Sequence, residues 1–115
     1  MKTEILTEEQ YKALSKRLVN AIEKHYKIIA LNTLQCSDYI LKKPIYITIE
    51  IEKDIVIASL DDIEAFAYAD TEYEAINQLC EEIVSVYEDL TEDKVNLGRL
   101  PRKWLAFLEE VIEDR

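Results

Sequence analysis

The spacing of apolar residues along the chain changes twice, and these changes predict where helices and strands lie. Near the N-terminus, apolar side chains recur at every third or fourth position, which is the period of an amphipathic helix. Thr7 and Gln10 precede this stripe with the spacing of a capping box. We therefore predict a helix that ends at about residue 25. Its apolar stripe consists of Tyr11, Leu14, Leu18, Ile22 and Tyr26.

Residues 28–34 are mostly apolar, but their spacing fits a continued helix and a strand equally well. Pro44 then marks a boundary, because the residue before a proline is disfavoured in the helical region. The sequence alone leaves the conformation of residues 28–43 open.

From residue 45 the period of the apolar residues becomes two, which is the period of a strand. Isoleucines take every second position from 45 to 51, a polar turn follows at 52–54, and residues 55–58 are apolar again. This pattern predicts an antiparallel hairpin. Ile63 and three alanines then alternate with other residues up to position 69, which predicts a third strand.

The helical period returns after residue 70. Thr71 and Glu74 have the spacing of a second capping box, and an apolar stripe follows them to about Leu90. We predict that this helix packs across the sheet, and that a last helix begins at Pro101, a residue suited to a first helical turn. The residues predicted to be buried are Ile76, Leu79, Ile83 and Tyr87 on the helix, against Ile47, Ile49, Ile55 and Ile57 on the sheet.

Together these elements predict an α+β fold with an N-terminal helix, a three-stranded antiparallel sheet with a helix packed across it, and a short C-terminal helix. The 115 residues have the length of a single domain. We divide the chain into an N-terminal helical extension at 1–43, a β-β-β-α core at 44–90 and a C-terminal helical segment at 91–115.

Few residues carry the chemistry of common active sites. Cys36 and Cys80 lack the spacing of metal ligands. The single histidine, His25, and the single glycine, Gly98, belong to no recognisable nucleophile pair or phosphate-binding loop. We therefore predict a protein that is not an enzyme and holds no cofactor and no metal. A two-metal carboxylate site is the enzymatic alternative, and its candidate ligands are Asp61, Asp62, Glu64 and Asp70.

Negative charge is concentrated in the middle of the chain. The formal net charge is −10, and residues 50–93 contain fifteen acidic side chains but one basic one. This balance makes direct nucleic-acid binding unfavourable. It has two explanations, which are that the charge keeps the protein in solution or that it complements a basic protein partner. No apolar run of eighteen residues exists, and the N-terminus lacks the apolar core of a signal peptide. We therefore predict a cytoplasmic protein that does not associate with membranes.

A longer pattern covers residues 45–90. It consists of the strands at 44–49 and 55–59 and, above all, of residues 69–76, in which Asp70, Thr71, Glu74 and Ala75 precede an amphipathic helix. This pattern resembles the HicB-like antitoxin family, which typically has G-D-T-x-E-E-A at this junction. The resemblance implies a truncated ribonuclease H-like β-β-β-α core in an antitoxin that binds a small basic ribonuclease toxin, often as a dimer or higher oligomer. The family's common DNA-binding module is not evident at residues 99–113.

The predicted function is therefore that of an antitoxin-like acidic binding protein, which binds and neutralises a small basic toxin such as a ribonuclease. The alternative is a non-enzymatic homo-oligomeric structural or adaptor protein, whose N-terminal helix pairs across a two-fold axis. Acidic side chains that lie off the apolar stripe of the helix at 71–90 are the predicted partner-binding residues. They are Glu72, Glu81, Glu82, Glu88 and Asp89.

Overall fold

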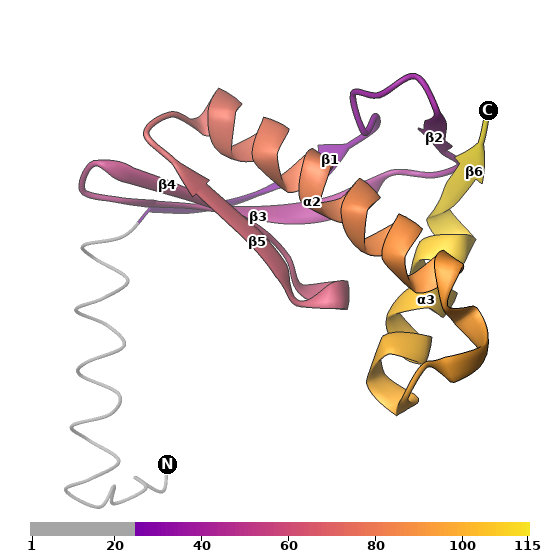
Figure 1. Ribbon diagram of the computed structural model, residues 1–115. Helices are drawn as coiled ribbons and strands as arrows, with labels where there is room; N and C mark the ends of the chain where they lie inside the picture. Colours follow the sequence, from indigo (N-terminus) through magenta and orange to yellow (C-terminus); the bar gives the residue numbers. More distant parts are fainter. Residues whose placement is uncertain (1–24) are drawn as a thin grey trace, which may run out of the picture.

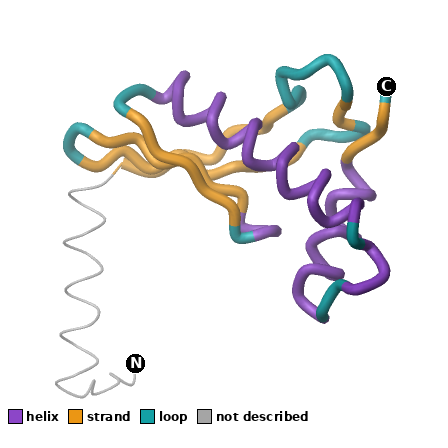
Figure 2. The backbone as a smooth tube through the Cα atoms, in the orientation of Figure 1, coloured by secondary structure: helices purple, strands orange, loops and turns teal. Residues whose placement is uncertain are grey.

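The computed structural model describes residues 25–115, which contain a four-stranded antiparallel sheet with one long helix across one face (Figure 1). These elements are β1 (His25–Leu31), β3 (Ile45–Glu52), β4 (Ile55–Leu60), β5 (Ala65–Ala69) and α2 (Glu72–Glu92). The strand order is β1-β3-β4-β5, so β5 forms one edge of the described sheet. Figure 2 shows that α2 crosses the strands on one side, where it contacts β4 and β5.

The predicted fold class is wrong in its sheet and in its N-terminal part. The sheet has four strands because the segment whose spacing fitted either element forms β1, antiparallel to β3. Ile29 lies opposite Ile47 and Leu31 lies opposite Ile45, so alternate residues of β1 reach the covered face of the sheet. The predicted N-terminal helix falls mostly on residues 1–24, which lie outside the described residues, and it is not supported. Tyr26, the last residue of its predicted apolar stripe, lies in β1. Both long described helices follow the sheet.

The C-terminal segment is also more than one helix. The helix α3 (Arg99–Val111) begins two residues before Pro101. It is followed by a short strand, β6 (Ile112–Asp114), which pairs antiparallel with β2 (Tyr39–Leu41) in a separate two-stranded sheet. The C-terminus therefore returns to the loop that leads into β3 (Figure 1).

The predicted hairpin is confirmed, but the residues of its second strand that face the helix are not the predicted ones. Lys53 and Asp54 form a two-residue turn, so Ile55 lies opposite Glu52 on the face turned away from α2. Ile55 is therefore 46% exposed, and Ile57 shares its face. The residues of β4 that enter the core are Val56, Ala58 and Leu60.

The core lies between α2 and the inner face of the sheet. Leu79 and Ile83 of α2 and Ile47 and Ile49 of β3 are completely buried, as predicted, while Ile76 is only partly buried. Burying one such side chain stabilises the fold by about 1.5–3 kcal/mol, so this layer is the main source of stability. The predicted start of α2 is confirmed as well, because the hydroxyl oxygen of Thr71 accepts a hydrogen bond from the Glu74 N–H at 3.1 Å.

Two short 3₁₀ turns complete the described chain. The first, η1 (Asp61–Ile63), takes Ile63 out of the predicted third strand and buries it in the core. The second, η2 (Lys94–Asn96), connects α2 with α3.

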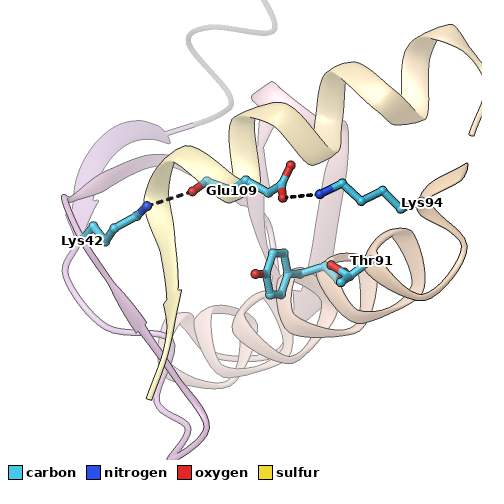
Figure 3. A network of polar contacts seen from close by, with 5 residues as sticks. Lys42, Thr91, Lys94 and Glu109 are labelled. Atoms are coloured by element: carbon cyan, nitrogen blue, oxygen red, sulfur yellow. Dashed lines mark hydrogen bonds and ion pairs between the residues drawn. The ribbon is translucent and has the colours of Figure 1, made fainter.

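Polar contacts fix α3 against the rest of the molecule (Figure 3). Lys94 Nζ lies 2.9 Å from a carboxylate oxygen of Glu109, and Lys42 Nζ donates to the backbone carbonyl of Glu109 at 3.0 Å. Within α2, the Thr91 hydroxyl donates to the carbonyl of Tyr87 at 2.7 Å. Glu109 thus helps to attach α3 both to η2 and to the loop before β3, and the ion pair of Lys43 with Glu110 adds to the second attachment.

The longest described helix, α2, has 21 residues, but charged side chains occupy its exposed side. Among residues 25–115, no helix combines the length and apolar character that crossing a membrane requires.

Candidate partner-binding surface

The helix α2 carries all five predicted partner-binding residues, but it brings only four of them to one side. Glu81, Glu82, Glu88 and Asp89 are exposed and fall on neighbouring rows of the helix surface. Glu72 lies in the first turn and on another side, where its carboxylate is 2.8 Å from Lys27 Nζ of β1. Glu72 therefore attaches the start of α2 to the sheet. It does not belong to the acidic side of α2, which consists of Glu81, Glu82, Glu88 and Asp89.

Glu88 also has a partner within the molecule. Its carboxylate accepts a hydrogen bond from the Tyr39 hydroxyl at 2.9 Å, and this bond raises the pKa of Tyr39 to about 12. The Tyr39 ring meets the Tyr87 ring edge-on, with centroids 5.3 Å apart. These contacts hold β2 against the C-terminal part of α2. The first role of Glu88 is therefore structural.

Glu81 and Glu82 border a groove between the edge strand β5 and α2. The groove has a volume of about 800 Å³. One wall is formed by β5 and the other by successive turns of α2, and small alanines of β5 face the helix between them. The residues that line the groove are Phe66, Ala67, Tyr68, Gln78, Glu81, Glu82 and Ser85.

Among residues 25–115, no basic side chain lines this groove beside its acidic ones. The ion pairs recorded within the described chain join Lys27, Lys43 and Lys94 to Glu72, Glu110 and Glu109, which all lie elsewhere. Carboxylates that lie close together with no cation beside them make the local electrostatic potential more negative, and they attract cationic groups.

A second, smaller cavity of about 380 Å³ lies between α2 and the loop that follows β1, and Glu81 and Ser85 line both this cavity and the groove. Cys36 and Cys80 both line it, and the buried side-chain oxygen of Asn77 has no hydrogen-bond partner in the described structure. Burial, with smaller contributions from Cys36 and Glu81, raises the pKa of the Cys80 thiol to about 11. Cys80 is therefore a poor nucleophile at neutral pH.

The carboxylates considered as metal ligands do not come together. Asp61, Asp62 and Glu64 border a shallow depression with Lys103 of α3, whereas Asp70 lies at the opposite end of β5. In the part of the chain that the structure describes, no three His, Cys, Asp or Glu side chains are placed to hold a metal ion. The two-metal interpretation therefore has no structural support.

The face of the sheet turned away from α2 carries large exposed side chains. Tyr46 is 66% exposed, and Phe66 and Tyr68 are exposed to a similar degree. The strand register places Phe66 in one row with Ile28, and Tyr68 in one row with Ile57. Alternation in the sequence predicted these two faces, and the face that the helix covers was predicted correctly for Ile47 and Ile49 but wrongly for Ile55 and Ile57.

The open edge of β5 is the feature of this surface that the sequence analysis missed. Alternation identified the third strand, but strand order depends on pairing between distant segments. Residues 65–69 contain no lysine or proline, but the central strands at 45–52 and 55–60 contain none either, so no local signal distinguished the edge strand.

Comparison of the whole chain with protein-family models, with curated proteins and with solved structures finds no match.

Proposed function

We propose that this protein is an antitoxin-like binding protein, which uses the acidic side of α2 to bind and neutralise a small basic protein such as a ribonuclease toxin. One observation carries the proposal. Glu81 and Glu82 are exposed beside a groove of about 800 Å³ whose lining, in the part of the chain that the structure describes, has no basic side chain. The resemblance of residues 45–90 to HicB-like antitoxins, stated above on Asp70, Thr71 and Glu74, agrees with the same function.

The inhibition follows from electrostatics. A ribonuclease grips RNA phosphates with lysine and arginine side chains, because phosphate contacts supply much of the affinity for nucleic acid. Carboxylates on α2 meet the same cations, so a complex at this surface leaves the ribonuclease unable to hold its substrate. Exposed charges at an interface mainly raise the association rate, and they disfavour acidic partners.

Growth rescue is the test. The proposal predicts a gene for a small basic protein beside this one, and cells that express that protein should grow only when the present protein is co-expressed. The variant Glu81→Lys with Glu82→Lys should lose rescue and slow association by about tenfold or more at low salt. A matched control, Asp61→Lys with Asp62→Lys, makes the same charge change at exposed residues of η1 and should rescue fully. No rescue by the wild-type protein would overturn the proposal.

A homo-oligomeric structural or adaptor protein is the second candidate, and the exposed outer face of the sheet favours it. Tyr46, Phe66 and Tyr68 expose more than 60% of their surface there. Aromatic side chains are enriched where proteins contact one another. Sedimentation would show a stable oligomer if this function holds, and Phe66→Ser with Tyr68→Ser would then yield monomers.

A further inference from the structure

Within the described sheet, β5 pairs with another strand on only one of its two sides. It pairs with β4 over its full length, from Ala65 opposite Leu60 to Ala69 opposite Val56. The strand order places no described strand on its other side. In an antiparallel sheet, alternate residues of an edge strand direct their N–H and C=O groups away from the sheet, where a further strand can pair with them.

Nothing in β5 itself protects this edge. Natural edge strands commonly carry lysine, proline or a bulge, which prevent unwanted pairing. The sequence of β5 is Ala-Phe-Ala-Tyr-Ala, and its register with β4 is continuous. An edge of this kind leaves backbone N–H and C=O groups available to a further strand in a complex.

The groove between β5 and α2 lies along this edge. We call the side of the groove that α2 forms the acidic wall, because it contains Glu81 and Glu82. Gln78, Glu81, Glu82 and Ser85 are spaced at three, four and seven residues, which places them along one side of α2 facing the groove. A strand added to β5 would run beneath that side of the helix.

We propose that the groove between β5 and α2 binds an extended segment of the basic partner, which pairs with β5 as a fifth strand of the sheet. This inference rests on the proposed function and specifies how the partner is bound. Pairing of backbone groups supplies affinity in such strand addition, and the side chains of the added strand supply specificity.

The two faces of the added strand meet different surroundings. Side chains that point toward α2 approach Glu81 and Glu82, which favour lysine or arginine. Side chains that point the other way lie next to Phe66 and Tyr68, which are 61% and 62% exposed and favour apolar neighbours. The binding segment should therefore alternate basic and apolar residues.

A second copy of this chain fits the groove poorly. If β5 paired with β5 of another copy across a two-fold axis, the two α2 helices would lie side by side on the same face of a continuous sheet. Glu81 and Glu82 of both copies would then face each other, and no basic side chain is among the described residues that line the groove. Like charges brought together in this way oppose association, whereas a basic segment is attracted.

Synthetic peptides test the mode of binding directly. The probe is Lys-Val-Lys-Val-Lys-Val-Lys, and a peptide of the same composition with four lysines followed by three valines is the control. The alternating peptide should bind the full-length protein at least tenfold more tightly, as measured by fluorescence anisotropy. Binding should slow hydrogen exchange of alternate amides in residues 65–69.

Two N-methylated versions of the probe separate backbone pairing from charge attraction. One is methylated on the amide nitrogens of its lysines and the other on those of its valines, and both retain every side chain. Only one set of alternate amides faces β5, so one version should lose at least tenfold in affinity and the other should bind unchanged. Equal binding of both versions would overturn strand addition.

Variants of the protein test the acidic wall. Glu81→Gln with Glu82→Gln should weaken binding of the alternating probe at least tenfold, while Asp61→Asn with Asp62→Asn should leave it unchanged. A complex with the basic partner protein that leaves the exchange of residues 65–69 unaltered would overturn strand addition without affecting the proposed function. A peptide-free dimer with protected β5 amides would overturn it in favour of a second copy.

Discussion

The two sides of α2 belong to one continuous helix but contribute to different properties of the protein. Leu79 and Ile83 are completely buried against the sheet, whereas Glu81 and Glu82 are exposed beside the β5 groove. Burial of a large apolar side chain is worth about 1.5–3 kcal/mol, and substitution of an exposed helical residue usually changes stability by about 0.5 kcal/mol or less. Stability and binding can therefore be altered separately, although the residues involved are neighbours in sequence.

The largest expected effect is on the buried side. Ile83→Ala should lower the free energy of unfolding by about 3 kcal/mol, because it leaves a cavity in a closely packed layer. Its sequence neighbour provides the control, since Glu82→Ala should change that free energy by no more than about 0.5 kcal/mol. Urea unfolding followed by circular dichroism measures both values. Equal losses in the two variants would contradict the division of α2 into two sides.

The reactivity of the Cys80 thiol is a second test of the difference between the buried and exposed sides of α2. Because burial raises the pKa of this thiol from 9.0 to about 11, the thiolate fraction at pH 8 falls by about 100-fold relative to an ordinary thiol. Iodoacetamide should therefore alkylate Cys80 at least about 100-fold more slowly in the native protein than in urea, as followed by mass spectrometry. Similar rates in both conditions would place Cys80 outside the buried layer.

The same shift in pKa has a consequence for stability at high pH. The unfolded chain releases the Cys80 proton at lower pH than the folded protein does. The contribution of the neutral thiol is therefore complete below about pH 9, and it is lost as the pH rises toward about 11.

A smaller effect is expected at the N-terminal cap of α2, which is common to both sides of the helix. Thr71→Ala should cost about 1 kcal/mol, because it leaves the Glu74 N–H without the hydroxyl oxygen that caps the helix. Thr71→Ser keeps that oxygen and should lie close to the wild type. Thermal unfolding measures both variants, and an unaltered melting temperature for Thr71→Ala would show that packing alone defines the start of the helix.

The elements that sequence analysis predicted correctly are those set by near neighbours. The hairpin of β3 and β4, the cap at Thr71 and the apolar stripe of α2 each depend on residues a few positions apart. The prediction failed for β4, where a two-residue turn places Ile55 opposite Glu52 and so turns Ile55 away from the core. A shift of one residue in a strand exchanges its two faces, and the period of two does not reveal the shift.

The candidate surface was predicted only in part. Glu81, Glu82 and Asp89 are exposed, in agreement with their positions off the apolar stripe. Glu72 and Glu88 have internal partners, Lys27 and Tyr39, which lie 45 and 49 positions away in sequence. Contacts over such separations have no local pattern in the sequence.

The sequence by itself determined the acidic character of residues 50–93, the period of each strand and helix that it predicted correctly, and the cap of α2, because charge, periodicity and capping are local properties. The tertiary structure alone decided that residues 25–31 form a strand, that β6 pairs with β2, and that β5 forms an edge of the described sheet. Each of these depends on hydrogen bonds between segments far apart in the chain. An apolar segment satisfies its backbone as a helix or as a strand, and the availability of a neighbouring strand selects between them.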